Sequence, residues 1–258
     1  FSFRYAWWRP AVSSRVPRIL MYHMIAPHRR GARFNGLRVP PAQFERQLAW
    51  LARNNWTSLT VSELLAAGDA PPQKSVVLTF DDGFADNLEH ALPLLKKFNV
   101  KATLYLVVDR HDRDWSTAKK AHHDSGELKN EAKLADDQVR LLLASGLVEL
   151  GSHTLTHPNF LKLTEEEKLF ELSESKNRLE KLFGVAVQSF AYPFGIYAPE
   201  DAKLVERCGY SSAVTTTPGL NLPGAVDRFQ LKRVKISGKD NLLAFIMRMR
   251  GGRRGWKK

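Results

Sequence analysis

The sequence predicts an α/β protein with a mostly parallel sheet and helices outside it, arranged as a barrel or as a doubly wound sheet. Short β-branched or apolar runs alternate with helical patterns along the chain, and no linker or internal repeat interrupts the alternation. With 258 residues, of which 43% are hydrophobic, the chain can bury one sizeable core. In either architecture the working residues are expected at the carboxyl ends of strands.

Apolar runs of strand length and amphipathic patterns mark the elements of the first half. Strands are expected over residues 18–25, 75–80 and 102–108, and helices over 41–54 and 86–98. The first helix follows a pair of prolines and places Phe44, Leu48 and Leu51 on one stripe. Residues 109–133 are polar and are interpreted as a long insertion or lid.

The second half continues the same alternation. Strands are expected over residues 148–151, 188–191, 211–215 and 231–236. Thr164 and Glu167 form a capping box at the start of a long helix that ends at about Phe183. Further helices are expected over residues 136–145, 199–208 and 240–249.

The formal net charge of +12 is placed almost entirely at the two ends of the chain. Residues 1–44 carry eight arginines and residues 241–258 carry six basic residues, and neither segment has an acidic residue. The remaining 25 basic and 27 acidic residues leave residues 45–240 with a net charge of −2. A uniformly basic nucleic-acid-binding domain is therefore not expected.

The same distribution predicts three parts: a basic aromatic segment over 1–17, one folded domain over 18–240, and a basic helix and tail over 241–258. Trp7 and Trp8 have the composition of an interfacial membrane anchor, or they cover the edge of the core. No apolar run approaches the roughly 18 residues of a membrane-spanning helix, and no signal-peptide core is recognisable. The chain starts with Phe rather than Met, so a cell-envelope, membrane-peripheral or cytoplasmic location stays open. The single cysteine excludes an intrachain disulfide.

Two adjacent carboxylates follow the most hydrophobic predicted strand. Asp81 and Asp82 can both face a pocket only if the chain turns there, and Gly83 permits such a turn. Their repulsion then requires a cation or a shared proton. The alternative is an ordinary Asp-Asp-Gly turn.

Two histidines follow the predicted strand over 148–151. His153 and His157 are four residues apart, a spacing that places both imidazoles on one face of a helical turn and that many metal sites use. Taken alone, the pair is also compatible with chance or with capping. Together with Asp82 it supplies two neutral nitrogen donors and one carboxylate, a set that leaves an open coordination position as in catalytic zinc sites.

A third loop follows the strand over 188–191. Pro193 and Gly195 make it a sharp loop whose backbone N–H groups could point at a metal-bound ligand, although a structural turn explains the same residues.

These three motifs, in this order, resemble the polysaccharide deacetylase family, the NodB-like carbohydrate esterases of family 4, over roughly residues 18–240. Residues 79–83 are similar to the first motif of the family and residues 152–157 to the second. The resemblance implies a distorted (β/α)7-type barrel, Asp81 as the catalytic base, and Asp82, His153 and His157 as ligands of a divalent metal, Zn²⁺ by ligand type.

The chain departs from the usual pattern of the family in its later motifs. Ala191 stands where an arginine usually holds the catalytic aspartate, and no histidine follows His157 to serve as the general acid. The Tyr-His pair near the start and the Phe-Ala-Tyr-Pro-Phe-Gly loop resemble the subgroup that deacetylates poly-N-acetylglucosamine. We therefore expect Arg233, or Arg228, to replace the missing arginine and His23 to line the site. A surface charge and a hydrogen-bonded histidine at a strand end are the alternatives.

The function implied by the resemblance is metal-dependent removal of an acetyl group from an N-acetylhexosamine-containing polysaccharide or glycolipid. A metal-bound water attacks with Asp81 as base, the backbone N–H of Phe194 stabilises the oxyanion, and protonated Asp81 or His23 is the acid. A catalytically impaired glycan-binding homologue is the alternative. We expect a monomer that makes peripheral contact with anionic membranes through its basic ends and does not bind nucleic acid.

Overall fold

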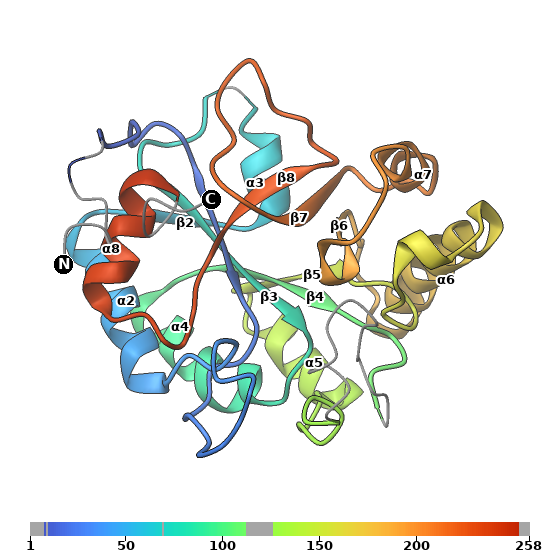
Figure 1. Ribbon diagram of the computed structural model, residues 1–258, viewed down its shortest axis with the longest axis horizontal. Helices are drawn as coiled ribbons and strands as arrows, with labels where there is room; N and C mark the ends of the chain where they lie inside the picture. Colours follow the sequence, from blue (N-terminus) through green and yellow to red (C-terminus); the bar gives the residue numbers. More distant parts are fainter. Residues whose placement is uncertain (1–7, 9, 69, 112–125, 253–258) are drawn as a thin grey trace.

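The computed structural model describes residues 8, 10–68, 70–111 and 126–252. In these residues seven parallel strands close into one barrel with helices around it, which confirms the predicted (β/α)7-type fold (Figure 1). The barrel strands are β1 (Arg18–Tyr22), β3 (Ser75–Asp82), β4 (Ala102–Leu106), β5 (Val148–Ser152), β6 (Ser189–Ala191), β7 (Ser212–Pro218) and β8 (Leu231–Lys235).

Strand β1 closes the barrel because it pairs on both sides. It is parallel to β3, from Arg18 opposite Val76 to Tyr22 opposite Phe80, and parallel to β8 through Leu20 opposite Val234. A doubly wound sheet would leave two free edges, so this double pairing decides between the two predicted architectures. The barrel is distorted where β6 is only three residues long and where the register of β7 against β8 shifts.

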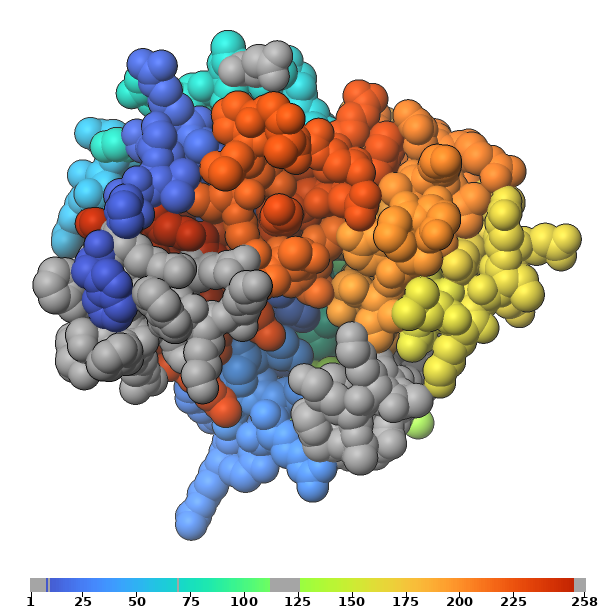
Figure 2. Space-filling model, turned by 45° about the horizontal axis from the view of Figure 1, so that its top comes forward, coloured from blue at the N-terminus to red at the C-terminus, as the bar shows by residue number. Residues whose placement is uncertain are grey.

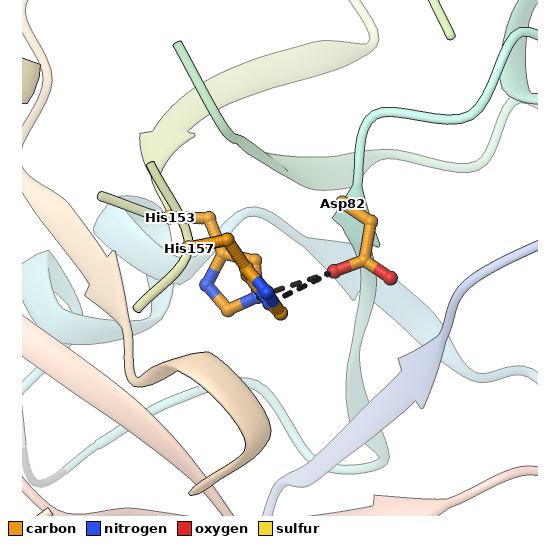
Figure 3. Close-up of side chains that lie close together, drawn as sticks. All are labelled: Asp82, His153 and His157. Atoms are coloured by element: carbon orange, nitrogen blue, oxygen red, sulfur yellow. Dashed lines mark hydrogen bonds and ion pairs between the residues drawn. The ribbon is translucent and has the colours of Figure 1, made fainter. Parts of the chain in front are cut away.

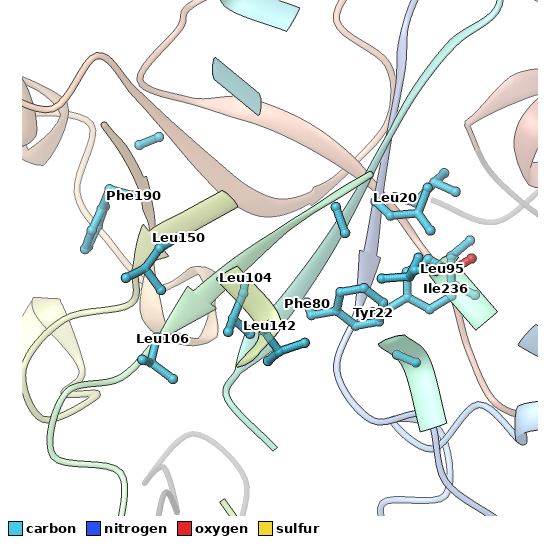
Figure 4. Close-up of a cluster of buried hydrophobic side chains, with 14 of the residues drawn as sticks. Leu20, Tyr22, Phe80, Leu95, Leu104, Leu106, Leu142, Leu150, Phe190 and Ile236 are labelled. Atoms are coloured by element: carbon cyan, nitrogen blue, oxygen red, sulfur yellow. The ribbon is translucent and has the colours of Figure 1, made fainter. Parts of the chain in front are cut away.

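The side chains of the strands alternate between the barrel interior and the layer under the helices. A small apolar cluster includes Val77 of β3, Tyr105 of β4 and Leu231 of β8. The intervening residues, such as Leu78 and Leu104, belong to a separate and larger cluster that also contains helix residues (Figure 4). By this alternation Thr79 and Asp81 continue the interior row of β3, and Arg233 continues that of β8.

A short strand and a short helix between residues 57 and 66 were not predicted. Strand β2 (Thr57–Leu59) pairs with the first residues of β3, and α3 (Val61–Ala66) follows it. The N–H of Val61 donates to Glu149 Oε2 at 3.0 Å, and the Val61 side chain is buried in the interior cluster. Elements of three and six residues are too short for their periodicity to be recognised in a sequence.

Helices cover the outside of the barrel. They are α2 (Pro41–Arg53), α4 (Leu92–Phe98), α5 (Asp136–Ala144), α6 (Glu165–Phe183), α7 (Asp201–Arg207) and α8 (Leu242–Gly251). The predicted stripe of α2 is buried, and the capping box of Thr164 and Glu167 is present at the start of α6. The helix expected over 86–98 begins with a π-helical turn, Asn87–Ala91, a form that often occurs next to functional sites.

The parts of the chain next to the two termini lie side by side at the amino end of the strands (Figure 2). The N–H of Val12 donates to the carbonyl of Arg250, and the buried Arg18 donates to the carbonyl of Met249 at 2.7 Å. Trp7 and six of the fourteen terminal cations lie outside the described residues, as do residues 112–125 of the predicted insertion. The boundaries at 17/18 and 240/241 stay predictions. In the described part of the chain, no helix is long and apolar enough to cross a membrane.

Candidate active site

Asp81 and Arg233 form a buried ion pair inside the carboxyl end of the barrel. Arg233 Nη1 donates to Asp81 Oδ1 and Arg233 Nη2 donates to Asp81 Oδ2, each at 2.7 Å. Arg233 also donates to Thr79 Oγ1 and to the carbonyl of Thr215. These two bonds fix the orientation of the guanidinium, and Asp81 neutralises its charge. Arg228 is exposed and stacks on Phe229 instead. Of the two arginines considered from the sequence, Arg233 is the one that contacts Asp81.

Asp82 leaves the regular course of β3 through a left-handed backbone. By strand alternation its side chain would point away from the interior, but φ is +80° at Asp82 and +82° at Gly83. At Gly83 a Cβ would come within 2.4 Å of the Leu106 side chain, so glycine is required there. The turn therefore begins one residue earlier than Gly83 alone would predict.

The carboxylate of Asp82 meets the imidazoles of His153 and His157 (Figure 3). Asp82 Oδ1 lies 3.3 Å from His153 Nε2 and 3.5 Å from His157 Nε2, and the two Nε2 atoms are 3.2 Å apart. All three side chains are buried.

The two histidines do not lie on a helical turn, and this part of the prediction was wrong. Residues 153–157 form an irregular turn after β5, with φ of +73° at Thr154 and +60° at His157. Left-handed backbone is rare for residues other than glycine and costs most for a β-branched one such as Thr154. The imidazoles meet because of this strained turn and not because of helical spacing.

The second nitrogen of His153 orients its ring. His153 Nδ1 lies 2.7 Å from the carbonyl oxygen of Ala191 on β6, an acceptor only, so Nδ1 carries the proton and Nε2 keeps its lone pair. Burial, together with the neighbouring His153, lowers the pKa of His157 to about 3. The imidazole of His157 is therefore neutral at physiological pH, the form that binds metal.

The two aspartates are held ionised. Burial by itself raises the pKa of Asp81, but the charge and the hydrogen bonds of Arg233 outweigh burial, and the pKa lies below its usual value. Burial by itself raises the pKa of Asp82, but the interactions with the neighbouring imidazoles, that of His153 first, outweigh burial and bring the pKa well below its usual range. Two imidazole nitrogens and one carboxylate oxygen thus converge on one point.

The geometry of these three atoms fits a divalent metal such as Zn²⁺. Tetrahedral ligands that bind zinc at about 2.0–2.2 Å are about 3.3–3.6 Å from one another. The observed separations of 3.2, 3.3 and 3.5 Å are close to this range without any rearrangement of the chain. Three protein ligands also leave one tetrahedral position open.

The loop after β6 borders the histidines. The short 3-10 turn Pro193–Gly195 places the Phe194 ring edge-on to His157, with 4.2 Å between the ring centroids. Its backbone is left-handed at Phe194 and at Gly195. The N–H groups of Gly195 and Ile196 donate to carbonyls of the same loop, whereas that of Phe194 makes no hydrogen bond to another described residue.

His23 lies directly after β1, next to Asp81 and Asp82 on the neighbouring strand. Its carbonyl accepts a hydrogen bond from Asn87 Nδ2 at 2.9 Å. Burial lowers the pKa of its imidazole, and the charges of Asp82 and Asp81 oppose this effect. All residues assigned to the site from the sequence therefore lie at the carboxyl ends of strands.

One residue beside the site was not found from the sequence. Glu171 on α6 is 8% exposed and accepts three hydrogen bonds from the turn between His153 and His157. The sequence feature that could have identified it is the position of an acidic residue on the buried stripe of α6, which it shares with Leu172, Ser175 and Leu179.

Comparison with known proteins places this geometry in a family. Residues 68–213 match the family model described as "Polysaccharide deacetylase". YxkH of Bacillus subtilis (strain 168), which is named for the same family, is 32% identical over 239 residues, 90% of this chain and 75% of YxkH. This chain belongs to the polysaccharide deacetylase family.

Two further members of the family extend the comparison. The poly-β-1,6-N-acetyl-D-glucosamine N-deacetylase of Staphylococcus aureus (strain MRSA252) is 24% identical over 77% of this chain and 68% of its own length. The crystal structure of BA0330 from Bacillus anthracis, also named for the family, superposes with a TM-score of 0.73 and 30% identity. The superposition covers 88% of this chain and 66% of BA0330, so this chain spans slightly less than two thirds of that protein.

Proposed function

We propose that this protein removes the acetyl group from an N-acetylhexosamine unit of a glycan by metal-dependent hydrolysis. The observation that carries the proposal is the meeting of Asp82, His153 and His157 next to the Asp81–Arg233 pair, in a member of the polysaccharide deacetylase family. The site contains a metal-binding face, a buried ionised carboxylate and a backbone donor. Metal-assisted hydrolysis of an amide uses these three components.

Asp82, His153 and His157 would hold the metal. A divalent cation bound there supplies Lewis acidity and lowers the pKa of water from 15.7 to about 7. The hydrogen bond from His153 to the Ala191 carbonyl keeps the ring aimed at the metal. Zn²⁺ is the metal that this ligand set favours.

Asp81 is the proposed base. Arg233 occupies one lone pair on each oxygen of Asp81, which leaves a second lone pair to accept a proton from the attacking water. The N–H of Phe194 is the proposed donor to the oxyanion that forms on the acetyl carbonyl. An amine leaves only when it is protonated, and His23 or the newly protonated Asp81 supplies that proton.

A glycan polymer fits the molecule better than a sugar linked to the membrane that the basic ends would contact. The site lies at the carboxyl ends of the strands, whereas Val12, Arg18 and Arg250 lie at the amino ends. A protein attached to a membrane through the exposed Arg15 and Arg250 at the amino ends of the strands would turn its site away from that surface. The name of the S. aureus relative supports poly-N-acetylglucosamine as the first polymer to test.

The test is acetate release by the purified protein from poly-β-1,6-N-acetylglucosamine oligomers, chitooligosaccharides and an acetylated glycolipid, with the metal content measured in parallel. We expect release from at least one oligomer, with about one metal ion per chain. Asp82→Ala should lose metal and activity together. Asp81→Asn should keep the metal and lose about 10²–10⁴-fold in rate.

The outcomes separate the competing hypotheses. A wild-type protein that binds metal and oligomers without releasing acetate would be the impaired glycan-binding homologue. Release from the glycolipid alone would reverse the preference for a polymer. An Asp81→Asn variant as active as wild type would assign the base to another group.

A further inference from the structure

Glu171 fastens the strained turn that carries both histidines. Its Oε2 accepts the N–H groups of Leu155 and Thr156, each at 2.9 Å, and its Oε1 accepts the hydroxyl of Thr156 at 2.6 Å. The carboxylate is buried on α6, 14 positions beyond His157 in the sequence. Ionised carboxylates in such positions form the strongest class of hydrogen bond.

The opposite side of the same turn is bound to the extension of β4. The N–H of Val108 donates to the carbonyl of Thr154 at 3.2 Å, and the N–H of Asp109 donates to that of Leu155 at 2.8 Å. The carbonyls of the turn are thus held from β4, and two of its N–H groups are held from α6. The turn would lose its fixed position if either side were released.

The turn requires these hydrogen bonds because its backbone is strained. Thr154 and His157 both have positive φ, and within the turn Thr154 Oγ1 accepts the N–H of His157 at 2.9 Å. Backbone of this kind persists only where surrounding contacts over-determine it. Without Glu171 the turn can relax toward ordinary φ values, which moves His157 relative to His153 and Asp82.

A second polar residue of α6 supports the same region. Ser175, one helical turn after Glu171, lies with its Oγ 2.9 Å from Ser152 Oγ, at the residue before His153. Both α6 residues lie on the buried face of the helix, where polar side chains are uncommon unless they are paired. The buried face of α6 is therefore built to bind this turn as well as to pack on the sheet.

We propose that Glu171 is a positioning residue that sets the metal affinity of the site by holding His157 in place. This inference rests on the proposed metal site but adds a residue that does not touch the metal. Groups that orient metal ligands from outside the coordination shell typically change metal affinity by about 10–100-fold when they are removed.

The experiment measures Zn²⁺ affinity by competition with a chromophoric chelator, together with the visible absorption spectrum of the Co²⁺-loaded protein. Glu171→Ala should weaken Zn²⁺ binding by about 10–100-fold and alter the Co²⁺ bands that report four-coordinate geometry. Glu171→Gln keeps an oxygen for both N–H groups and an NH₂ for the Thr156 hydroxyl, so it should recover most of the affinity. Glu174→Ala is the matched control, since Glu174 lies on the same helix and pairs with Arg178 instead.

Thermal unfolding of the metal-free variants separates positioning from folding. A Glu171→Ala protein that stays folded and binds Zn²⁺ as wild type does overturns the inference. Should Glu171→Ala not fold, Thr156→Val removes only the hydroxyl bond, and it must still weaken Zn²⁺ binding more than Glu174→Ala does. A wild-type protein without Zn²⁺ affinity would instead contradict the proposed function itself.

Discussion

Arg233 supplies the guanidinium partner of Asp81. The last residue of β6, Ala191, is not an arginine, and the guanidinium reaches Asp81 from β8, 152 residues away in sequence. The bidentate pair is buried on both sides, with exposed fractions of 0% and 3%. Removing one partner of such a pair is strongly destabilising, by about 3–5 kcal/mol, because the other charge stays buried.

Arg233→Ala should therefore change the pH dependence of the enzyme as well as its stability. Without the guanidinium, burial dominates and the pKa of Asp81 rises. A base must be deprotonated to act, so the acidic limb of kcat/KM against pH should move to higher pH. The exposed neighbour Lys232 provides the control, Lys232→Ala. A folded Arg233→Ala protein with an unshifted acidic limb would show that Arg233 does not set the pKa of the catalytic base.

Asp86 is a second carboxyl whose charge affects the stability of the protein. It accepts the N–H of Ile25 at 2.6 Å, and burial raises its pKa to about 6. Because this pKa is above that of the unfolded chain, the neutral acid stabilises the fold below about pH 4, and this contribution is lost as the pH rises through 6.

Asp86→Asn removes that dependence. The free energy of unfolding of the variant, relative to wild type, should increase by about 2 kcal/mol between pH 4 and pH 7. Urea unfolding at a series of pH values measures it. Asp137→Asn, at an exposed position on α5, serves as the control, and the change in Asp86→Asn should exceed the change in this variant. A flat difference for Asp86→Asn would contradict the assignment of a raised pKa.

At the scale of elements, the loop after β6 depends on close contact with β7. Gly195 has a φ of +64°, and a Cβ there would lie 1.9 Å from Thr216 Oγ1. Gly184 at the end of α6 has a φ of +66° and open space around it. Comparing Gly195→Ala with Gly184→Ala therefore separates the free-energy cost of left-handed backbone from that of a steric clash.

Gly195→Ala should reduce activity and stability more than Gly184→Ala does. Gly184→Ala should cost about 1 kcal/mol from backbone strain alone, and the clash adds about 1–3 kcal/mol in Gly195→Ala. The clash also displaces the Phe194 N–H, so kcat should fall in that variant only. Equal effects of the two substitutions on kcat would remove Phe194 from the proposed oxyanion site.

The long elements were predictable because their signals are local. The stripe of α2, the capping box of α6 and the apolar run of β3 each lie within one continuous segment. Residues 57–66 and the π-helical turn of Asn87–Ala91 were missed because three to six residues do not show a period. The turn of His153 and His157 was misjudged because a spacing of four residues does not specify positive φ.

At the scale of the whole molecule, the charge distribution predicts a salt-dependent interaction. The described segments next to the two termini, which carry the exposed Arg15 and Arg250, meet at the amino end of the barrel. Each cation close to an anionic membrane surface contributes about 1 kcal/mol at low salt. The protein should therefore sediment with phosphatidylserine-containing vesicles at low ionic strength, and it should be released as salt is added.

The matched variant replaces Arg253, Arg254, Lys257 and Lys258 by serine. It should bind the same vesicles more weakly, while acetate release from a soluble oligomer stays unchanged. Binding to purely neutral vesicles, or binding that persists at high salt, would contradict an electrostatic contact.

The sequence by itself determined most of the chemistry of this protein. Asp81, Asp82, His153 and His157 were recognisable because motifs at strand ends are short and contiguous, and the alternation of elements predicted the parallel sheet. Only the tertiary structure decided three features: β1 closes the barrel, Arg233 pairs with Asp81, and Glu171 accepts hydrogen bonds from the turn between His153 and His157. Each of these joins residues on different elements, and no local pattern records which distant partner a buried charge will meet.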